Sequence, residues 1–471
     1  MPTGFENIYQ KLPVLLQNIG CSYYGWKKSK NLYGPNFNNI LNRLLISEKW
    51  SKNEIEAYQN EKLHELIHHA YVHVPYYRET MKKLNLYPGD IKTRDDLHKL
   101  PVLTKEEVRA NIDKLVADST DKKKLLVSHT SGTTGKALSL YTSREAETFQ
   151  SAVWWRHRMR YGLHYNDWCV NFTGKVAVPE NQNKPPYWRW NYPMRQVVIN
   201  NQQITFQKIR DIIKFLDETD FKFYVGYPSI IHSLAATANQ MGLTLNNHPK
   251  IIAFGAENST DFQIQDIKKF TTATLTEHYG SVEGCGSASY CPHNVFHEDF
   301  EYGILECVDP DIQEDGTISG KIVCTGFANF DFPLIRYEIG DIATWAPVNY
   351  QCPCGLQSNV IMHIDGRNDD YIITPEGRKS KDMEYVFHNT DNVRDAQIVQ
   401  YKCDELIVRI VQRNRYTEKD EESIKDGIRR WISQNFEILF EYVNEIEREP
   451  NGKQRFVKNY IKKNKYNSIE V

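Results

Sequence analysis

Apolar residues recur at helical spacing over roughly the first 80 residues of the chain. In the segment 50–74 the apolar positions lie three and four residues apart and line one helix face: Leu63, Leu66, Ile67 and Ala70. Further along, Thr104 stands three residues ahead of Glu107, which is the spacing of a capping box that opens a helix. Residues 1–100 are therefore predicted to form a helical N-terminal extension.

Between residues 125 and 345, short apolar runs alternate with helical patterns. Examples are the segments 222–242, 250–258 and 261–280. An alternation of strand and helix is typical of an α/β domain with a mixed or parallel sheet. We therefore predict one large domain, residues 1–365, of mixed sheets and helices that includes the helical extension.

The pattern changes after Asp365. Period-two strands are predicted at 396–402, 404–413 and 437–443, with an amphipathic helix between the last two. Its apolar face consists of Ile424, Ile428, Trp431 and Ile432. These elements predict a small α+β domain over residues 366–471, a normal size for a domain.

Composition and charge exclude some classes of function. The chain has 471 residues, 58 Lys and Arg against 60 Asp and Glu, and a formal net charge of −2, so no nucleic-acid partner is expected. No apolar run of about 18 residues occurs, so no membrane span is expected. The N-terminus lacks the pattern of a secretory signal, and nine cysteines are present, which favours free thiols and a cytoplasmic location.

The stretch SHTSGTTGK, residues 128–136, has the composition of a phosphate-binding loop. It is not a Walker A loop, because only two residues separate Gly132 from Gly135 and Ala137 follows Lys136. Hydroxyl side chains and glycine backbone amides can still converge on an anion. Apolar alternation on both sides predicts two strands joined by this loop. An ordinary Gly/Ser/Thr hairpin loop remains the alternative on this stretch alone.

Three further stretches, in chain order, give the sequence a family resemblance. They are EHYGSVEG at 277–284, PLIRYEIGD at 333–341 with DGRNDD at 365–370, and EPNGKQRF at 449–456. Together with the loop, they resemble the adenylate-forming superfamily of acyl-CoA ligases, adenylation domains and luciferases. Within it, the chain looks closest to phenylacetate–CoA ligases. The N-terminal stretches LPVLLQNIGCSYYG and HAYVHVPYYR further resemble the CapK-like branch, which is associated with capsule polysaccharide biosynthesis.

The resemblance implies ATP-dependent activation of a small carboxylic acid as an acyl-adenylate, with release of pyrophosphate. It implies that ATP phosphates are bound by Ser131, Gly132, Thr133, Thr134, Gly135 and Lys136. Gly255, Ala256 and Glu257 are expected beside the adenine and the acyl pocket. Tyr279 of the Tyr279-Gly280-Ser281 stretch would stack on adenine and Ser281 would donate to the α-phosphate. Glu283 would hold Mg²⁺.

The other implied residues lie towards the C-terminus. Asp341 would accept both ribose hydroxyls, since a carboxylate suits a vicinal diol. Arg367 would support the ribose or phosphate, and Lys453 would bridge the substrate carboxylate and the α-phosphate. Asp369 holds the family's hinge position, which implies that the small domain is mobile. Where many relatives have Thr before the Gly-Asp pair this chain has Ile339, which makes the ribose-side contacts less certain.

The hypotheses differ in the acceptor of the activated acyl group. Coenzyme A is the first expectation, with Arg378, Lys379 and Lys381 as a basic cluster for its phosphates, although a solvated turn explains them equally well. The alternative is transfer to an amine or hydroxyl of a sugar or sugar nucleotide. A non-catalytic nucleotide-binding scaffold of a capsule assembly is the alternative of another class, and nothing favours a luciferase-like oxygenase. The sequence does not indicate an oligomeric state.

A structural zinc site is also predicted. Cys352-Pro-Cys354-Gly355 places two thiols close together, and Cys291 and His297 would complete a Cys₃His tetrahedron. His293 is the rival nitrogen ligand. Some phenylacetate-ligase relatives carry such a site, and the alternative is a set of reduced cysteines without metal.

Overall fold

The computed structural model describes most of the chain. The described residues are 8–129, 138–367, 371–380, 383–387, 390, 392–449 and 452–461, with the backbone alone at 367, 379, 384 and 385. Residues 131–136 and Asp369, for which a phosphate loop and a hinge were predicted, lie outside them.

The N-terminal region is helical, as its periodicity predicts. Its main helices are α2 (Val14–Leu32), α3 (Phe37–Ser47), α4 (Lys52–His73), α5 (Pro75–Lys83) and α6 (Lys105–Ala110). The predicted apolar face of α4 is fully buried against the sheet. Thr104 caps α6 through the predicted capping box, because its backbone N–H donates to Glu107 at 2.8 Å and its hydroxyl accepts from the Glu107 amide at 3.2 Å.

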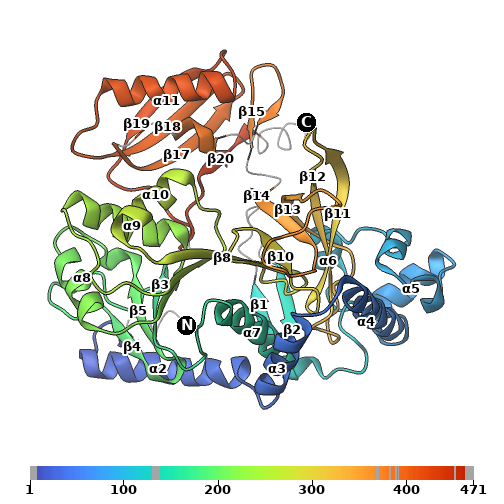
Figure 1. Ribbon diagram of the computed structural model, residues 1–471. Coiled ribbons are helices and arrows are strands. Elements are labelled where there is room, and N and C mark those ends of the chain that lie inside the picture. Colours follow the sequence, from blue (N-terminus) through green and yellow to red (C-terminus); the bar gives the residue numbers. More distant parts are fainter. Residues whose placement is uncertain are drawn as a thin grey trace.

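A twelve-stranded sheet forms the centre of the large domain (Figure 1). Its spatial order is β11 (Gly303–Ile312), β12 (Ile318–Gly326), β13 (Tyr337–Trp345), β14 (Val360–Arg367), β10 (Phe296–Glu298), β9 (Ser287–Tyr290), β8 (Thr274–Gly280), β7 (Ile251–Gly255), β6 (Phe223–Gly226), β3 (Cys169–Thr173), β5 (Gln196–Asn200) and β4 (Arg189–Asn191). Strands β5, β3, β6, β7 and β8 are parallel, and the pairings outside this run are antiparallel.

Helices cover both faces of the parallel half. The face that carries Val170 and Phe172 packs on α8 (Ile209–Glu218), α9 (Pro228–Gln240) and α10 (Asp261–Phe270). The face that carries Cys169 packs on α3 and α7 (Arg144–Met159). Successive side chains of β3 thus enter two different cores, as the period of two in a strand dictates. A separate pair, β1 (Leu126–His129) and β2 (Ser139–Thr142), forms the predicted strands on either side of the glycine-rich stretch.

The C-terminal part has its own sheet and core. Its four-stranded sheet has the order β19 (Glu437–Tyr442), β18 (Glu405–Gln412), β17 (Val393–Lys402) and β20 (Val457–Asn459), with α11 (Glu418–Trp431) packed on it. A second pair, β15 (Ile372–Ile373) and β16 (Lys379–Ser380), precedes it. Ile424, Ile428 and Ile432 are buried as predicted. Trp431, assigned to the same face, is the last residue of α11 and is exposed instead.

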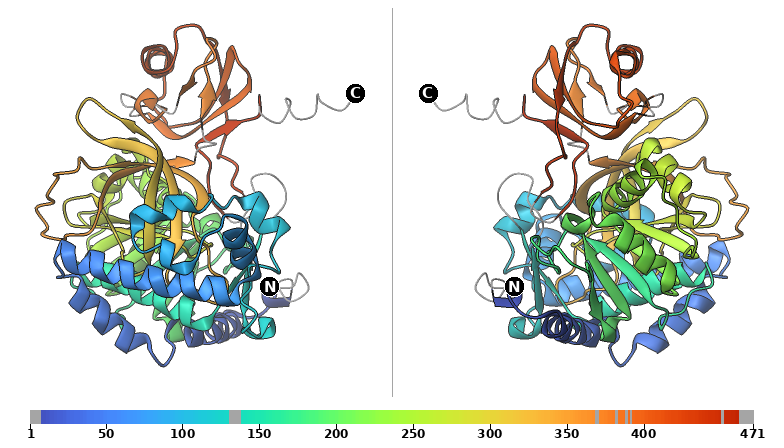
Figure 2. Two further views of the ribbon diagram at one scale, coloured as in Figure 1. Left: turned by 90° about the vertical axis from the view of Figure 1, so that its right-hand side faces the viewer. Right: turned by 90° about the vertical axis from the view of Figure 1, so that its left-hand side faces the viewer.

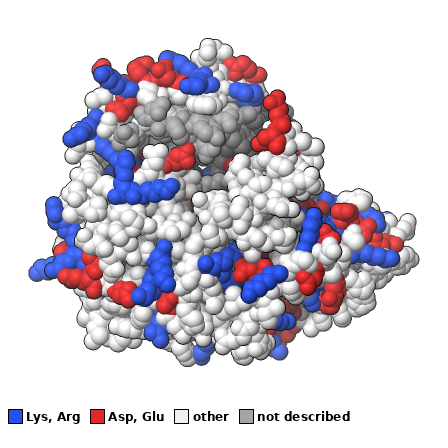
Figure 3. All heavy atoms as spheres, in the orientation of Figure 1, with Lys and Arg blue, Asp and Glu red and all other residues white. Residues whose placement is uncertain are grey.

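The predicted fold class, a large α/β domain with a small α+β domain, is confirmed, while the predicted limits 1–365 and 366–471 stay a prediction. Figure 1 and both views of Figure 2 show the small domain above one end of the large one. Lys, Arg, Asp and Glu are interspersed over the face seen in Figure 3. None of the described helices is long and apolar enough to cross a bilayer.

Candidate active site

The carboxyl ends of two adjacent parallel strands form the base of the site. Gly255 at the end of β7 stands in register with His278 of β8, so the residues that follow the two strands meet at one edge of the sheet. In open parallel sheets this edge is where ligands bind. The structure therefore brings together the stretch 255–257 and the stretch 279–281, both of which were predicted to contact the nucleotide.

The turn after β7 carries backbone strain. Ala256 has φ +69°, in the left-handed region that alanine rarely adopts. Strained backbone of this kind persists where the surrounding structure holds it, and it gathers at ligand sites. The turn directs Glu257 inward, where the residue is half-buried. Burial is the main cause of a pKa for Glu257 above its ordinary value.

Tyr279 and Asp341 meet across the sheet. The Tyr279 hydroxyl donates a 2.7 Å hydrogen bond to Asp341 Oδ2. Burial first, and the nearby Asp341 charge second, raise the pKa of Tyr279 well above its ordinary range, so the tyrosine stays a neutral donor. Asp341 lies on β13 in register with Arg367 of β14, which places the backbones of these two predicted ligands side by side.

The turn after β8 offers polar groups without strong internal partners. Ser281 Oγ is buried and has no hydrogen-bond partner among the described residues. A buried hydroxyl in that state costs free energy unless a ligand accepts its hydrogen bond. Two residues on, Glu283 accepts a 3.4 Å hydrogen bond from the Tyr337 hydroxyl. The donor set fits a phosphate beside Ser281 and leaves the Glu283 carboxylate for a cation.

The loop that carries Lys453 docks against this same edge. It is a tight turn, in which the Glu449 amide donates to Lys453 O at 2.8 Å and the Gly452 amide donates to Glu449 O at 2.7 Å. The Gln454 backbone N–H then donates to Glu257 Oε1 at 2.7 Å. The small domain thereby presents Lys453 beside the turn that follows β7.

Close main-chain packing accompanies this contact. A Cβ on Gly452 would lie 2.3 Å from Gly174 Cα in the loop after β3. Gly452 also has φ +84°, so both its conformation and its neighbour exclude a side chain. Arg448 secures the turn from the other side, since its guanidinium donates to Ser229 Oγ at 2.6 Å and to Gly452 O at 3.1 Å.

Sequence reasoning missed two parts of this arrangement. Arg448 precedes Lys453 by five residues, yet it belongs to no periodic pattern and no motif that would mark it. Glu257 was expected beside the adenine and the acyl pocket, and it also accepts hydrogen bonds from the backbone amides of Ser229 and Gln454, at 3.3 and 2.7 Å. Both facts depend on contacts between distant segments, for which the sequence holds no local signal.

The predicted zinc ligands form one cluster in the antiparallel half of the large domain. Cys291 follows β9, His297 lies on β10, and Cys352 and Cys354 lie in the loop between β13 and β14. The ligand atoms of Cys291, His297, Cys352 and Cys354 all lie within 4.8 Å of one another. Cys291 Sγ and Cys352 Sγ are 3.7 Å apart, close to the roughly 3.8 Å edge of a tetrahedron with Zn–S bonds of about 2.3 Å. The cluster contains His297 and not the rival His293, whose backbone N–H instead donates to Cys291 Sγ at 3.3 Å.

Comparison with known proteins matches this architecture. A family model described as the CapK C-terminal domain matches residues 372–460. The protein CapK of Staphylococcus aureus is 28% identical over 466 residues, which cover 97% of this chain and 99% of that protein. The resemblance to CapK-like, adenylate-forming proteins is confirmed. The chain is also 25% identical to a phenylacetate-coenzyme A ligase of Aromatoleum evansii over 342 residues, 69% of this chain and 73% of the ligase.

Solved structures of 2-hydroxyisobutyryl-CoA ligase share the fold of this chain. A postadenylation-state structure superposes with a TM-score of 0.70 at 17% identity, covering 89% of this chain and 93% of the ligase. The thioesterification-state structure of that ligase superposes with a TM-score of 0.53, also at 17% identity, over 90% of this chain and 94% of the ligase. Taken together, these similarities to ligases confirm the prediction of an adenylate-forming, CoA-ligase-like enzyme.

Proposed function

We propose that the protein activates a carboxylic acid with ATP, forming an acyl-adenylate and releasing pyrophosphate. The observation that carries the proposal is the 2.7 Å hydrogen bond from the Gln454 backbone to Glu257. It holds the Lys453 turn of the small domain at the sheet edge where Tyr279, Asp341 and Ser281 converge. Two anions must meet in this reaction, and a positioned cation and oriented donors lower the barrier to that encounter.

Each group has a role in this proposal. Asp341, oriented by the Tyr279 hydroxyl, accepts the ribose hydroxyls, and Ser281 donates to the α-phosphate. Lys453 neutralises the substrate carboxylate and the α-phosphate oxygen as they approach. Residues 131–136 and Arg367 bind further phosphate and ribose oxygens. Mg²⁺, held by Glu283, would neutralise phosphate charge when bound.

For the second step we propose transfer of the acyl group to coenzyme A, in surface polysaccharide biosynthesis. The named relatives include coenzyme A ligases and CapK, which supports both parts of that statement. The better superposition on the postadenylation state than on the thioesterification state supports an arrangement suited to the first step. Rotation about Asp369 would then withdraw Lys453 and admit the acceptor.

A panel of carboxylic acids, including aromatic and uronic acids, tests the proposal through ATP–pyrophosphate exchange. At least one acid should support exchange that depends on Mg²⁺. Adding coenzyme A should then yield a thioester. An acyl-adenylate that persists with coenzyme A but is consumed by an amino sugar or sugar nucleotide would favour the sugar acceptor. Nucleotide binding without exchange for every acid class would favour a non-catalytic scaffold.

We also propose that Cys291, His297, Cys352 and Cys354 bind a structural zinc ion. The four ligand atoms fit the charge and geometry that zinc prefers, and two of the thiols come from a loop with little other structure. The ion would fasten the loop between β13 and β14 to β9 and β10. This places it on the segment that leads from Asp341 to Arg367, away from the reacting groups.

A further inference from the structure

Helix α2 has its polarity reversed relative to an ordinary surface helix. Its buried residues are Gln17 and Gly25, and it packs on β4 through polar contacts. Gln17 Oε1 accepts from Arg189 Nε at 2.6 Å, and Asn18 Oδ1 accepts from the Trp190 amide at 3.0 Å. Gly25 lies so close to Asn191 that a Cβ would fall 1.8 Å from Asn191 Oδ1. The inward face is therefore polar or small by necessity.

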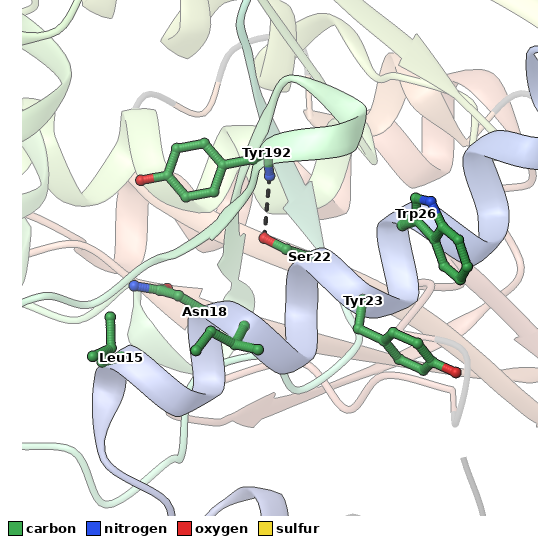
Figure 4. Close-up of a pocket in the computed structure, with 7 residues that line it drawn as sticks. Leu15, Asn18, Ser22, Tyr23, Trp26 and Tyr192 are labelled. Carbon is green, nitrogen blue, oxygen red and sulfur yellow. Dashed lines mark hydrogen bonds between the residues drawn. The ribbon is translucent and has the colours of Figure 1, made fainter.

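The outward face of α2 is apolar. Leu15 is 70% exposed, Ile19 57% and Tyr23 65%, at a spacing of four residues along one side of the helix. Trp26 continues the stripe, and Tyr192 joins it from the loop after β4. Together with Asn18 and Ser22 they line a shallow groove of about 430 Å³ (Figure 4). A contiguous exposed apolar surface of this kind marks an interaction site.

The stretch of sequence around this stripe contains basic residues and no acidic ones. No Asp or Glu occurs from residue 7 to residue 47, whereas Lys11, Lys27, Lys28 and Lys30 do. Lys30 Nζ lies 3.5 Å above the Trp26 ring, so the charge stands at the edge of the apolar stripe. Lys28 is near the half-buried Glu147, and the net charge of the patch comes from the other three lysines.

The position of α2 leaves the candidate site clear. In Figure 1 and in both views of Figure 2, α2 lies at the end of the large domain opposite the small domain. A partner seated on α2 would therefore touch neither the Lys453 turn nor the strand ends that carry Tyr279 and Asp341. The small domain would keep its freedom to rotate.

We propose that the apolar stripe of α2, residues Leu15, Ile19, Tyr23 and Trp26, docks the protein on the surface of an anionic lipid bilayer. Leu and Ile would enter the acyl boundary, and Tyr and Trp suit the headgroup level because their rings are amphipathic. The lysines at both ends of the stripe would meet lipid phosphates. A second copy of the chain is a poorer occupant, since a two-fold interface brings the patch against itself and opposes lysine to lysine.

Vesicle co-sedimentation of the full-length protein tests this proposal. The protein should sediment with phosphatidylcholine vesicles that contain phosphatidylglycerol, less with phosphatidylcholine alone, and less again in high salt. Ile19→Asp should reduce sedimentation at least about tenfold, because it places a charge in the helix face that would enter the bilayer. Lys27→Gln with Lys30→Gln should weaken binding about 30-fold, from the contribution of each lysine near an anionic surface.

Matched controls separate the patch from general effects. Ile312→Asp makes the same change at an isoleucine that is 71% exposed and lies on β11, at the opposite edge of the sheet from β4. It should leave binding intact. Lys82→Gln with Lys83→Gln removes two exposed lysines of α5 and should have little effect. All variants should keep the wild-type melting temperature. Failure of the wild type to bind anionic vesicles, equal binding by Ile19→Asp, or a dimer in light scattering that Ile19→Asp dissociates would overturn the proposal.

Discussion

The backbone amide of Gln454 donates a 2.7 Å hydrogen bond to the half-buried carboxyl group of Glu257, which lies 197 residues earlier in the chain. This bond joins the small domain to the turn after β7. Because Ser229 and Arg448 share the same contact, the position of Lys453 depends on a few groups that can be changed one at a time. The following predictions use that dependence.

Gly452→Ala should impair adenylation by disturbing the docked turn. The added methyl group would lie 2.3 Å from Gly174 Cα, and relief of such overpacking costs about 1–3 kcal/mol. Pyrophosphate exchange measures the loss. Gly377→Ala is the control, because Gly377 has nearly the same φ of +83° but nothing within 4 Å of its added Cβ. Equal losses in the two variants would assign the effect to backbone strain rather than to docking.

Lys453→Ala should abolish the adenylation step. Removing a positioned charge from the reacting centre raises the barrier by roughly 3–4 kcal/mol. The variant should still convert a synthetic acyl-adenylate to product, because the proposed rotation takes this lysine away before the second step. Lys419→Ala, on the exposed start of α11, is the control. Wild-type pyrophosphate exchange by Lys453→Ala would refute the assignment of the lysine.

Tyr279→Phe should weaken ATP binding. The hydroxyl of Tyr279 orients Asp341 through a 2.7 Å hydrogen bond, and such a bond to a charged group contributes about 1.5–3 kcal/mol. We expect the KM for ATP to rise about tenfold or more, with a smaller change in the KM for the acid. Tyr401→Phe, an exposed tyrosine of β17, should leave both constants unchanged. An unchanged KM for ATP in Tyr279→Phe would separate Asp341 from ribose binding.

Glu257→Gln should alter the pH dependence of thermal stability. Burial raises the folded-state pKa of Glu257 above its ordinary value of 4.5. At a pH between these two pKa values, the folded protein therefore holds a proton that the unfolded chain has lost. The contribution of this group to stability is therefore full below pH 4.5 and falls as pH rises towards the folded-state pKa. The glutamine variant keeps an oxygen acceptor for the Gln454 amide and should lack that fall. Melting temperatures measured from about pH 4 to pH 8 give the comparison, and parallel curves for variant and wild type would contradict it.

Zinc removal should destabilise the large domain. Purified protein should contain about one zinc ion per chain, and Cys352→Ser should lose it together with several degrees of melting temperature. Cys403→Ser changes an exposed cysteine of the small domain and should affect neither quantity. Chelator-washed wild type should behave like Cys352→Ser. Protein without bound zinc, and with unchanged stability in Cys352→Ser, would end the proposal.

Features encoded over short distances were predicted well from the sequence. The apolar face of α4 and the capping box of α6 depend on residues three or four apart, so their spacing alone indicates them. The strands on either side of the glycine-rich stretch follow from alternation in the same way. Trp431, the last residue of α11, was assigned wrongly: its side chain is exposed although that of Ile432, one residue beyond the helix, is buried, and only the tertiary structure sets which of the two is covered.

Contacts between distant segments were predicted less completely. The cysteine cluster was found because only one residue separates Cys352 from Cys354, but the choice of His297 over His293 depends on the turn after Cys291. There Asn294 takes φ +58° and its amide bonds back to Cys291 O at 3.0 Å. The bond between Gln454 and Glu257 had no signal at all, because its donor is a backbone group that every residue except proline possesses.

Gln454 contributes only its main chain to that bond and Gly452 contributes the lack of a side chain, whereas Arg448 and Arg413 join the small domain to the large one through their side chains. A C-terminal domain from a diverged relative would therefore fit Glu257 if it kept the glycine, the turn and these two arginines. Exchange of this domain between related genes would then yield proteins whose two domains still dock. With the roles proposed above, such an exchange would bring the Lys453 of one protein to the strand ends that carry Tyr279 and Asp341 in another.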